Sequence, residues 1–481
     1  MGLSPLLALE GICAVFDWGR PALYDDPFVG FRSVVPLFVK SEDQTRYEIP
    51  KSRQSFFCAD GFLAKKPAGE FRVFSLGEST TQGNPWTIET SFSTWLEISL
   101  RAADPSRRFR VVNCGGISYA SYRLVPILEE VLAHQPDLIV VCVGHNEFLE
   151  NRTFAHVAGR GRLLSIALDA ASRLRTFTLL REGYLRLQGI SSADPPENRP
   201  IMPTEVEALL DYRGGLEEYH RDEAHERDVI TQYRYNLRRM VELCRTAGVP
   251  LILINPVSNF CDLPPFKSEH RADLTADELE RWESLCEEAR HHLHGDHRDL
   301  LKASWLFGEA CRVDPLYAGA FYNLAQCYQP AGKFELAREA YLKAKDLDVC
   351  PLRALGPMND AVLEIARDTR APLVDAQQLI QDRSADGIVG GDWLVDHVHP
   401  SIEGHQLIAD ARAEKLVELG MVRPRNDWQA VKRERYREHF DALGNLYFFK
   451  GEQRLTALRN WAAGRAKHMR PKSDVAGAAK E

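Results

Sequence analysis

The chain lacks the features of a disulfide scaffold, a membrane-spanning protein or a nucleic-acid binder. Its ten cysteines include no Cys-x-x-Cys pair, and Cys142 and Cys244 lie in apolar runs, which predicts reduced, buried thiols. The apolar run 3–16 carries Glu10 and is shorter than the roughly 20 residues that cross a bilayer. A formal net charge of -8, with basic residues dispersed among acidic ones, predicts no nucleic-acid partner.

The location of the protein follows only in part from the sequence. The run 3–16 has no early Lys or Arg and is no intact signal peptide, so the sequence as it stands predicts a cytoplasmic protein. A truncated start would give the alternative, an extracytoplasmic protein tethered to the membrane at its N-terminus. Membrane association therefore stays open. The basic tail around Arg465 and Lys472 is expected to be a solvated terminus.

Length and composition predict a compact protein of two or three packed units. Domains commonly hold about 100 to 200 residues, and this chain has 481, of which 44% are hydrophobic and 27% charged. Short β-rich runs alternate with helical patterns such as 228–247 and 401–420, which predicts a three-layer α/β/α sandwich around a parallel, flavodoxin-like sheet. The five runs are 72–76, 110–113, 138–143, 250–254 and 372–375.

Two stretches do not belong to a minimal α/β core. The first, 151–225, is interpreted as a cap-like insertion. The second, 284–350, follows the fourth strand, and from Ala318 onward its small and aromatic residues match a helical-hairpin unit of about 34 residues. We therefore expect two tetratricopeptide-like (TPR-like) repeats, which would overhang the carboxyl edge of the sheet as a lid or a recruitment surface. Helix packing alone also explains the pattern, so partner binding stays open.

The first strand run leads into Gly77-Glu78-Ser79, which places a serine where a parallel strand gives way to a helix. Backbone N–H groups point outward at such a place, and the helix dipole favours negative charge. An oxyanion formed by attack of Ser79 on an ester would therefore be stabilised. The alternative is that the serine only caps the helix.

Asp396 and His399 follow the last strand run and are three residues apart. In a tight turn the Asp396 carboxylate can accept from one ring nitrogen of His399, which leaves the other nitrogen to deprotonate a serine. A metal site is the alternative, because carboxylate and imidazole also bind zinc or manganese. Its candidate ligands would be Asp396, His397, His399, His405 and His145.

Two further loops follow strand runs and can supply hydrogen-bond donors. Gly115 lies after the second run, where its backbone N–H can approach a substrate without a side chain in the way. Asn146 lies after the third run, and its amide can donate to the same oxyanion.

These four blocks together resemble the SGNH hydrolase family, also called GDSL esterases and lipases. The resemblance implies that Ser79 is the nucleophile, that Asp396 and His399 complete a triad, and that Gly115 and Asn146 form the oxyanion hole with the Ser79 N–H. It covers roughly 72–420, interrupted by the two insertions. Two positions depart from the family pattern, because Glu78 and Glu147 stand where aspartates are usual. The segment 26–32 looks like the lead-in of bacterial members that are often tethered outside the cytoplasmic membrane.

The resemblance divides the chain into an N-terminal lead-in (1–70), two parts of a hydrolase domain (71–283, with the cap at 151–225, and 351–420), the TPR-like insertion (284–350) and a C-terminal helical extension with a basic tail (421–481). It implies a serine hydrolase that cleaves carboxylic esters, such as O-acetyl groups of glycans, through an acyl-enzyme and without cofactor or metal. An O-acyltransferase with the same triad is one alternative, and a noncatalytic scaffold whose repeats bind a protein partner is another. Ser118, in Gly116-Ile117-Ser118-Tyr119-Ala120, is a rival nucleophile, because this segment approximates the elbow of an α/β-hydrolase.

Overall fold

A computed structural model describes residues 4–16, 18, 30–31, 35–150, 174–177, 179–180, 201–202, 206, 208–211, 215–295 and 298–465. Most of the predicted cap, 151–225, lies outside these residues, as does the basic tail beyond Arg465. Among the described helices, none has both the length and the apolar character that crossing a membrane requires.

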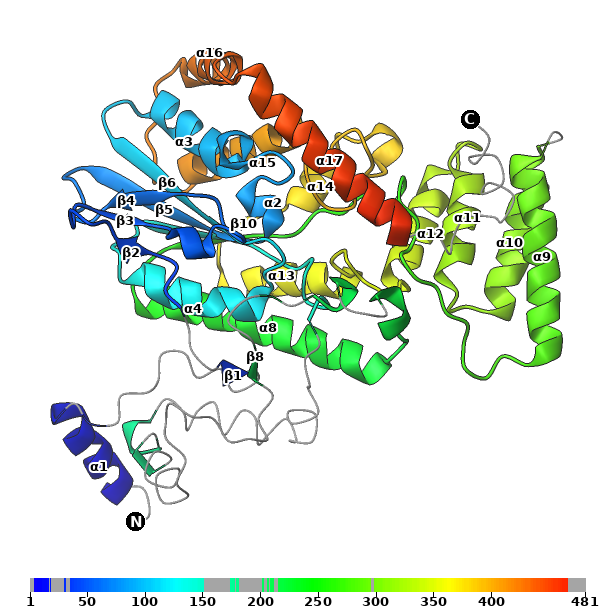
Figure 1. Cartoon of the computed structure of the whole chain (residues 1–481), viewed down its shortest axis with the longest axis horizontal. Coiled ribbons are helices and arrows are strands. Elements are labelled where there is room, and N and C mark those ends of the chain that lie inside the picture. Colours follow the sequence, from blue (N-terminus) through cyan, green and yellow to red (C-terminus); the bar gives the residue numbers. More distant parts are fainter. Residues whose placement is uncertain are drawn as a thin grey trace.

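The core is a parallel sheet of five strands in the order β10-β9-β7-β5-β6, as Figure 1 shows in part. All five strands were predicted from the sequence, and their parallel pairing is confirmed. Gly77 at the end of β5 pairs with Gly115 in β6 and with Cys142 in β7, so these three strands end side by side. The strands are β5 (Glu70–Gly77), β6 (Arg108–Gly115), β7 (Leu138–Cys142), β9 (Leu251–Ile254) and β10 (Leu373–Val374).

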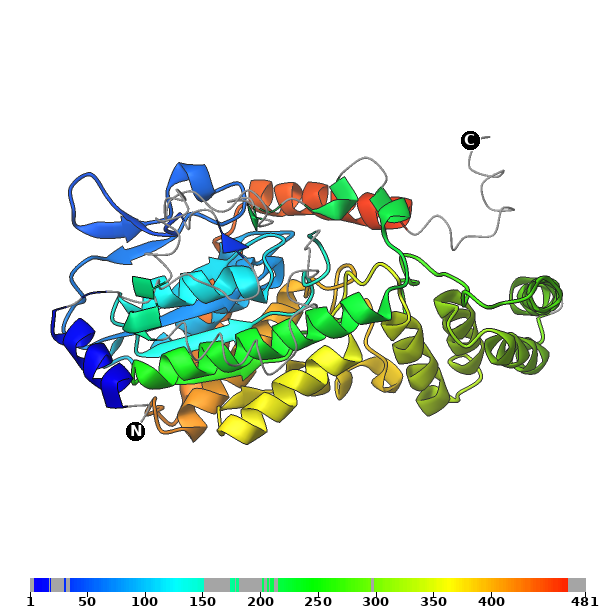
Figure 2. The same ribbon diagram turned by 90° about the horizontal axis from the view of Figure 1, so that it is seen from below.

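Helices cover both faces of the sheet, because side chains on alternate positions of each strand point to opposite sides. On one face, Val73, Val111 and Val140 pack in a core with α3 (Phe92–Ala103), α15 (Ile402–Glu418) and α16 (Trp428–Asp441). On the other face, Phe74 and Val112 pack against three helices, of which α8 and α13 lie side by side (Figure 2, green and yellow). These are α4 (Ser121–Leu132), α8 (Glu223–Thr246) and α13 (Gly356–Thr369).

Sequence signals place the ends of the two predicted helices. The Ser401 side chain accepts a hydrogen bond from the Gly404 N–H and caps α15, and Gly420 lies just past its end with φ of 69°. The Asp222 side chain caps α8 before the predicted start at 228, and Gly248 follows its end with φ of 68°. The helix around 228–247 therefore begins earlier than the apolar pattern indicated.

The N-terminal lead-in contains more structure than the sequence indicated. It includes α1 (Ser4–Val15) and an antiparallel sheet of β2 (Val39–Lys40), β3 (Arg46–Glu48) and β4 (Gly61–Leu63). Between β3 and β4, the Phe56 carbonyl accepts from the Ile117 N–H and from the Gln82 side chain. This segment therefore contacts the loops that follow β5 and β6.

The second predicted insertion contains four consecutive helices, each packed on the next, at one end of the molecule (Figure 1, green). The predicted boundary at 284 falls inside the first of them, because Thr275 and Glu278 form a capping box that starts the helix earlier. The predicted boundary missed this earlier start because the boundary was drawn from the repeat pattern alone. The helices are α9 (Ala276–His294), α10 (Leu300–Val313), α11 (Ala318–Tyr328) and α12 (Phe334–Asp346). Their assignment as TPR-like repeats stays a prediction.

These helices lie on the carboxyl side of the sheet and contact the loop that follows β9. The Tyr322 hydroxyl of α11 donates to the Cys261 carbonyl at 2.7 Å. Two residues earlier, the Asn259 N–H donates to the carbonyl of His397 at 3.0 Å. The insertion is therefore connected, through this loop, to the segment that carries Asp396 and His399.

A C-terminal helix, α17 (Asn445–Arg465), runs from α16 toward α12 (Figure 1, red). It touches two loops at the carboxyl edge. Gly451 lies so close to Trp86 that a Cβ at this position would be 2.1 Å from the indole ring, and Arg459 donates to the Val395 carbonyl. The helical extension predicted for 421–481 thus packs on the sheet domain.

Candidate active site

Ser79 is the first residue of α2 (Ser79–Gln82) and is separated from the end of β5 only by Glu78. The chain turns back so tightly that a Cβ on Gly77 would lie 1.9 Å from Thr81 Oγ1 and 2.3 Å from the Cys142 carbonyl oxygen. Only glycine fits there. Ser79 is buried, with 8% of its surface exposed.

The structure brings Ser79, His399 and Asp396 together in one chain of hydrogen bonds. His399 Nε2 lies 2.8 Å from Ser79 Oγ, and His399 Nδ1 lies 2.6 Å from Asp396 Oδ2. Because the Asp396 carboxylate can only accept, it holds the ring proton on Nδ1. The unprotonated Nε2 then accepts from the Ser79 hydroxyl, which is the arrangement a general base requires.

The Asp396 carboxylate is fixed by its own turn. Its Oδ1 accepts the N–H groups of Val398 and His399 at 2.9 and 2.8 Å. Burial would raise the pKa of Asp396, but His399, His397 and these hydrogen bonds hold that pKa well below its usual range. The carboxylate therefore stays charged beside the imidazole.

Asn84 is a neighbour of the triad that sequence reasoning missed. Its Nδ2 lies 3.5 Å from His399 Nε2, on the same side as the Ser79 hydroxyl. An asparagine five residues beyond the serine, in a turn before Pro85, carries no recognisable sequence signal.

Asn146 lies at the carboxyl end of β7 and is held in one orientation. Its Nδ2 donates to the Tyr119 carbonyl at 3.2 Å, which identifies this atom as the amide nitrogen. One of the two amide hydrogens makes that bond, and the second is left to donate elsewhere. Asn146 is only partly buried, unlike Glu147 beside it.

Gly115 does not match its expected role. Its N–H already donates to the Asn113 side chain at 2.9 Å. A Cβ on Gly115 would lie 2.2 Å from the backbone nitrogen of Gln82, so the glycine allows α2 to pack directly on β6. This N–H is therefore turned to the strand rather than to a substrate.

Ser118, unlike Gly115, has a backbone N–H that no described residue accepts. The N–H groups of Gly116, Ile117 and Tyr119 donate to carbonyls, whereas that of Ser118 has no partner within the described part of the chain. Ser118 has φ of 61°, the left-handed conformation that favours glycine. A serine gives no sequence signal for this conformation, which is why the expectation fell on Gly115.

Three histidines other than His399 are buried at this edge or beside it. His145 Nδ1 accepts the Ala354 N–H at 3.1 Å, and burial lowers the pKa of His145 well below its usual range. Burial also lowers the pKa of His397 to about 4, against the attraction of Asp396, and that of His405 to about 3. All three are therefore neutral near pH 7.

The metal alternative finds no support in these positions. Within the described ranges, no group of three or more His, Cys, Asp or Glu side chains is placed to hold a metal ion.

Comparison with known proteins gives one decisive match. Residues 75–314 match the GDSL-like Lipase/Acylhydrolase family. The chain carries a GDSL-like lipase/acylhydrolase domain. It is thus a hydrolase that acts on ester bonds. The match includes Ser79 and Asn146 but ends before Asp396 and His399, which the fold returns to the same edge of the sheet.

Other comparisons add little to the family match. None of the curated proteins compared with the chain matches its sequence. Among solved structures, it is similar to an acetylxylan esterase from Geobacillus stearothermophilus, with 13% identity, a TM-score of 0.30, and coverage of 72% of this chain and 94% of the other. It is also similar to a lipase/acylhydrolase from Enterococcus faecalis, with 11% identity, a TM-score of 0.32, and coverage of 74% and 99%. TM-scores this low carry no argument about substrate.

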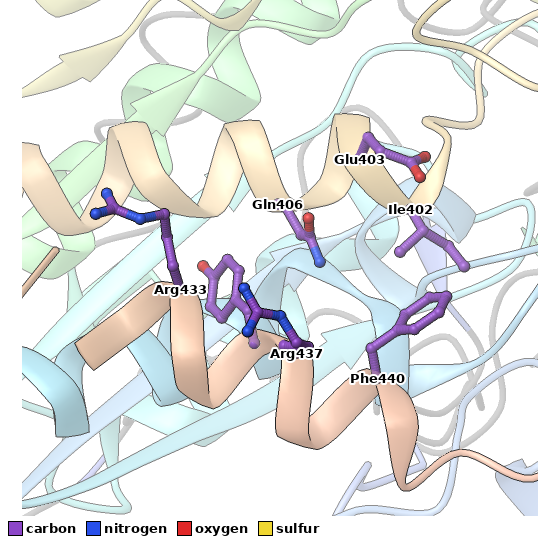
Figure 3. A pocket seen from close by; sticks show the side chains of 7 residues that line it. Ile402, Glu403, Gln406, Arg433, Arg437 and Phe440 are labelled. Carbon is purple, nitrogen blue, oxygen red and sulfur yellow. The ribbon is translucent and has the colours of Figure 1, made fainter. Parts of the chain in front are cut away.

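A surface pocket of about 300 Å³ lies between α15 and α16 (Figure 3). Arg433 and Arg437 border it from α16, and Gln406 faces them from α15. None of the predicted site residues lines this pocket. It is therefore separate from the triad.

Proposed function

We propose that the protein is a serine esterase that works through an acyl-enzyme on Ser79. The observation that carries this proposal is the hydrogen-bonded chain from Ser79 Oγ to His399 Nε2 and from His399 Nδ1 to Asp396 Oδ2. His399 takes the Ser79 proton as Oγ attacks the ester carbonyl, and it returns that proton to the leaving alcohol. Water, activated by the same nitrogen, then releases the acid.

The oxyanion that forms on the former carbonyl oxygen when Ser79 attacks needs donors, and we propose three. They are the second amide hydrogen of Asn146, the backbone N–H of Ser118 in place of Gly115, and the backbone N–H of Ser79. Support comes from the orientation of the Asn146 amide and from the unpaired state of the Ser118 N–H among the described residues. Such donors stabilise charge that develops only in the transition state.

For the substrate, we propose a carboxylic ester with a small acyl group, and O-acetyl groups of glycans are the first class to test. Ser79 and His399 are 8% and 4% exposed, which leaves little room for a long acyl chain beside the nucleophile in the described part of the site. A panel of p-nitrophenyl esters from acetate to octanoate would test this. A preference for octanoate would contradict it.

The test of the function compares two serines. Ser79→Ala should abolish p-nitrophenyl acetate hydrolysis and labelling by a fluorophosphonate, because the nucleophile is gone. Ser118→Ala should keep both, because the proposed donor there is a backbone N–H and His399 contacts the Ser79 hydroxyl instead. Loss of turnover only in Ser118→Ala would make Ser118 the nucleophile.

An O-acyltransferase remains the second candidate, since the same triad can pass the acyl group to a sugar hydroxyl instead of water. Product analysis with and without an acceptor glycan distinguishes the two. A folded protein that fails to react with the fluorophosphonate would instead favour the scaffold, with the helices α9 to α12 as the surface for a protein partner.

A further inference from the structure

Glu78, the residue before Ser79, has a buried carboxylate that points away from its own helix. Its Oε1 accepts three consecutive backbone N–H groups, those of Gly144 at 2.9 Å, His145 at 2.9 Å and Asn146 at 3.1 Å. Its Oε2 lies 3.1 Å from the His145 nitrogen as well. The side chain is 1% exposed. One residue therefore connects the nucleophile turn with the turn that carries Asn146.

The same turn is held from its other side by Glu147. Its carboxylate accepts the Ser121 N–H at 2.6 Å and the Ser121 hydroxyl at 2.9 Å. Ser121 begins α4, directly after the loop that contains Ser118 and Tyr119. Glu78 thus joins the loop after β5 to the loop after β7, and Glu147 joins the loop after β7 to the segment after β6.

We propose that Glu78 is a positioning residue that sets the distance between Ser79 and the Asn146 amide. This rests on the proposed function, because the position of Asn146 matters only if its amide stabilises an oxyanion. Glu78 does not touch the substrate. It acts through Asn146, whose backbone it holds at a fixed place beside the nucleophile.

The chemistry of the carboxylate suits this role. Hydrogen bonds to a charged acceptor are roughly twice as strong as neutral ones. Three N–H groups left without an acceptor in a buried turn would force that turn to move toward water. Burial raises the pKa of Glu78, and the nearby Glu147 carboxylate raises it further; the three N–H groups, which can only donate, oppose this rise and stabilise the charged form.

Glu78→Gln keeps the shape of the side chain but removes its charge. The new amide nitrogen would also face the His145 N–H, donor against donor, where Oε2 now lies 3.1 Å away. We expect kcat for p-nitrophenyl acetate to fall about 10- to 100-fold with KM changed less than about threefold, because the lost interaction belongs to the transition state. Glu78→Asp keeps the charge with a shorter reach and should restore part of kcat.

A matched control is available in Glu130. Its carboxylate also accepts two backbone N–H groups, those of Leu37 at 2.7 Å and Phe38 at 2.8 Å, but it lies on α4 away from the triad. Glu130→Gln makes the same chemical change. It should leave kcat within about twofold of the wild-type value, even if it lowers the melting temperature as much as Glu78→Gln does.

The decisive experiment is a double-mutant cycle with Asn146→Ala. That variant alone should lower kcat about 100- to 1000-fold. If Glu78 acts through Asn146, adding Glu78→Gln should cost less than about threefold more. Losses that multiply in full, or a Glu78→Gln variant with the wild-type kcat, would overturn the proposal. Should Glu78→Gln fail to fold, the cycle is run with Glu78→Asp and judged by the same criterion.

A readout that needs no turnover separates this proposal from the proposed function. Hydrogen exchange at Gly144, His145 and Asn146 should be at least about tenfold faster in Glu78→Gln than in the wild type, and unchanged in Glu130→Gln. If Ser79→Ala hydrolyses esters as fast as the wild type does, the proposed function fails while this exchange result still stands. Unchanged exchange in Glu78→Gln would refute the positioning role itself.

Discussion

Replacing Asp396 by asparagine would test the triad with the smallest change in shape. The Asp396 carboxylate has two occupied oxygens, with Oδ1 accepting the N–H groups of Val398 and His399 and Oδ2 lying 2.6 Å from His399 Nδ1. The new carbonyl oxygen must take the place of Oδ1, because those two N–H groups are buried and need an acceptor. The amide nitrogen then faces His399 Nδ1.

This arrangement reverses the histidine tautomer. Because the amide nitrogen donates, His399 Nδ1 must accept, and the ring proton moves to Nε2. Nε2–H would then point at Ser79 Oγ, 2.8 Å away, and could no longer take its proton. The loss of a correctly oriented base in such a triad costs about 10⁴ in kcat, which corresponds to about 5.5 kcal/mol in the activation barrier.

The assay is steady-state hydrolysis of p-nitrophenyl acetate, with thermal unfolding of each variant measured in parallel. Asp375→Asn is the matched control, because Asp375 also follows a strand at the carboxyl edge but accepts from the Gln378 N–H and the Asn255 side chain. It should keep kcat within a few fold. A folded Asp396→Asn variant with more than about a tenth of the wild-type kcat would show that Asp396 does not orient the base.

Three further variants test the packing and charge around the site. Gly115→Ala should lower the unfolding free energy by at least about 3 kcal/mol in denaturant titrations, because the new Cβ would meet the α2 backbone at 2.2 Å. Gly308→Ala is the control: this glycine has open space around it, so the change should be neutral or stabilising. Arg412→Met should raise the unfolding free energy by about 1 to 3 kcal/mol, because the buried guanidinium has no hydrogen-bond partner among the described residues. An unfolding free energy below that of the wild type would contradict this. The pKa of His397 is about 4 in the fold, below the ordinary value for histidine, so the unfolded chain binds this proton first as pH falls. The unfolding free energy should therefore decrease between pH 6.5 and 4, by about 3 kcal/mol from His397 alone. His397→Gln should flatten this pH profile, and an unchanged profile would refute the lowered pKa of His397 as its cause.

The parts of the site that could be predicted are those set by neighbours in the sequence. Asp396 and His399 are three residues apart, so one tight turn joins them whatever the rest of the chain does. The strands that precede Ser79 and Asn146 appear as apolar runs, and parallel strands end at a common edge. Family resemblance then supplied the roles.

The parts that could not be predicted depend on backbone direction or on contacts between distant segments. The free N–H belongs to Ser118 rather than Gly115 because Ser118 has a left-handed backbone conformation, and a serine in the sequence does not indicate that conformation. Glu78 was noticed only as a departure from the family pattern, because its three partners lie more than 60 residues away in the chain. The helices α8 and α9 also start earlier than predicted, because capping residues set their first turns. Apolar periodicity does not reveal a first turn made of polar residues.

The order of the strands explains why these particular loops meet. In β7-β5-β6, the strand that carries Ser79 lies between the strands that carry Asn146 and the Ser118 loop, so both sets of proposed donors flank the nucleophile without any long excursion. His399 has no such position, because β10 is at the edge of the sheet and is separated from β5 by β9 and β7. The chain uses the segment from α14 (Ala376–Gln381) to Asp396 to return to Ser79, and the Asn259 N–H holds that segment at the His397 carbonyl. The turn that carries Asp396 and His399 thus depends for its place on contacts with distant segments, so changes in the β9 loop or in α11 should reach catalysis through His399.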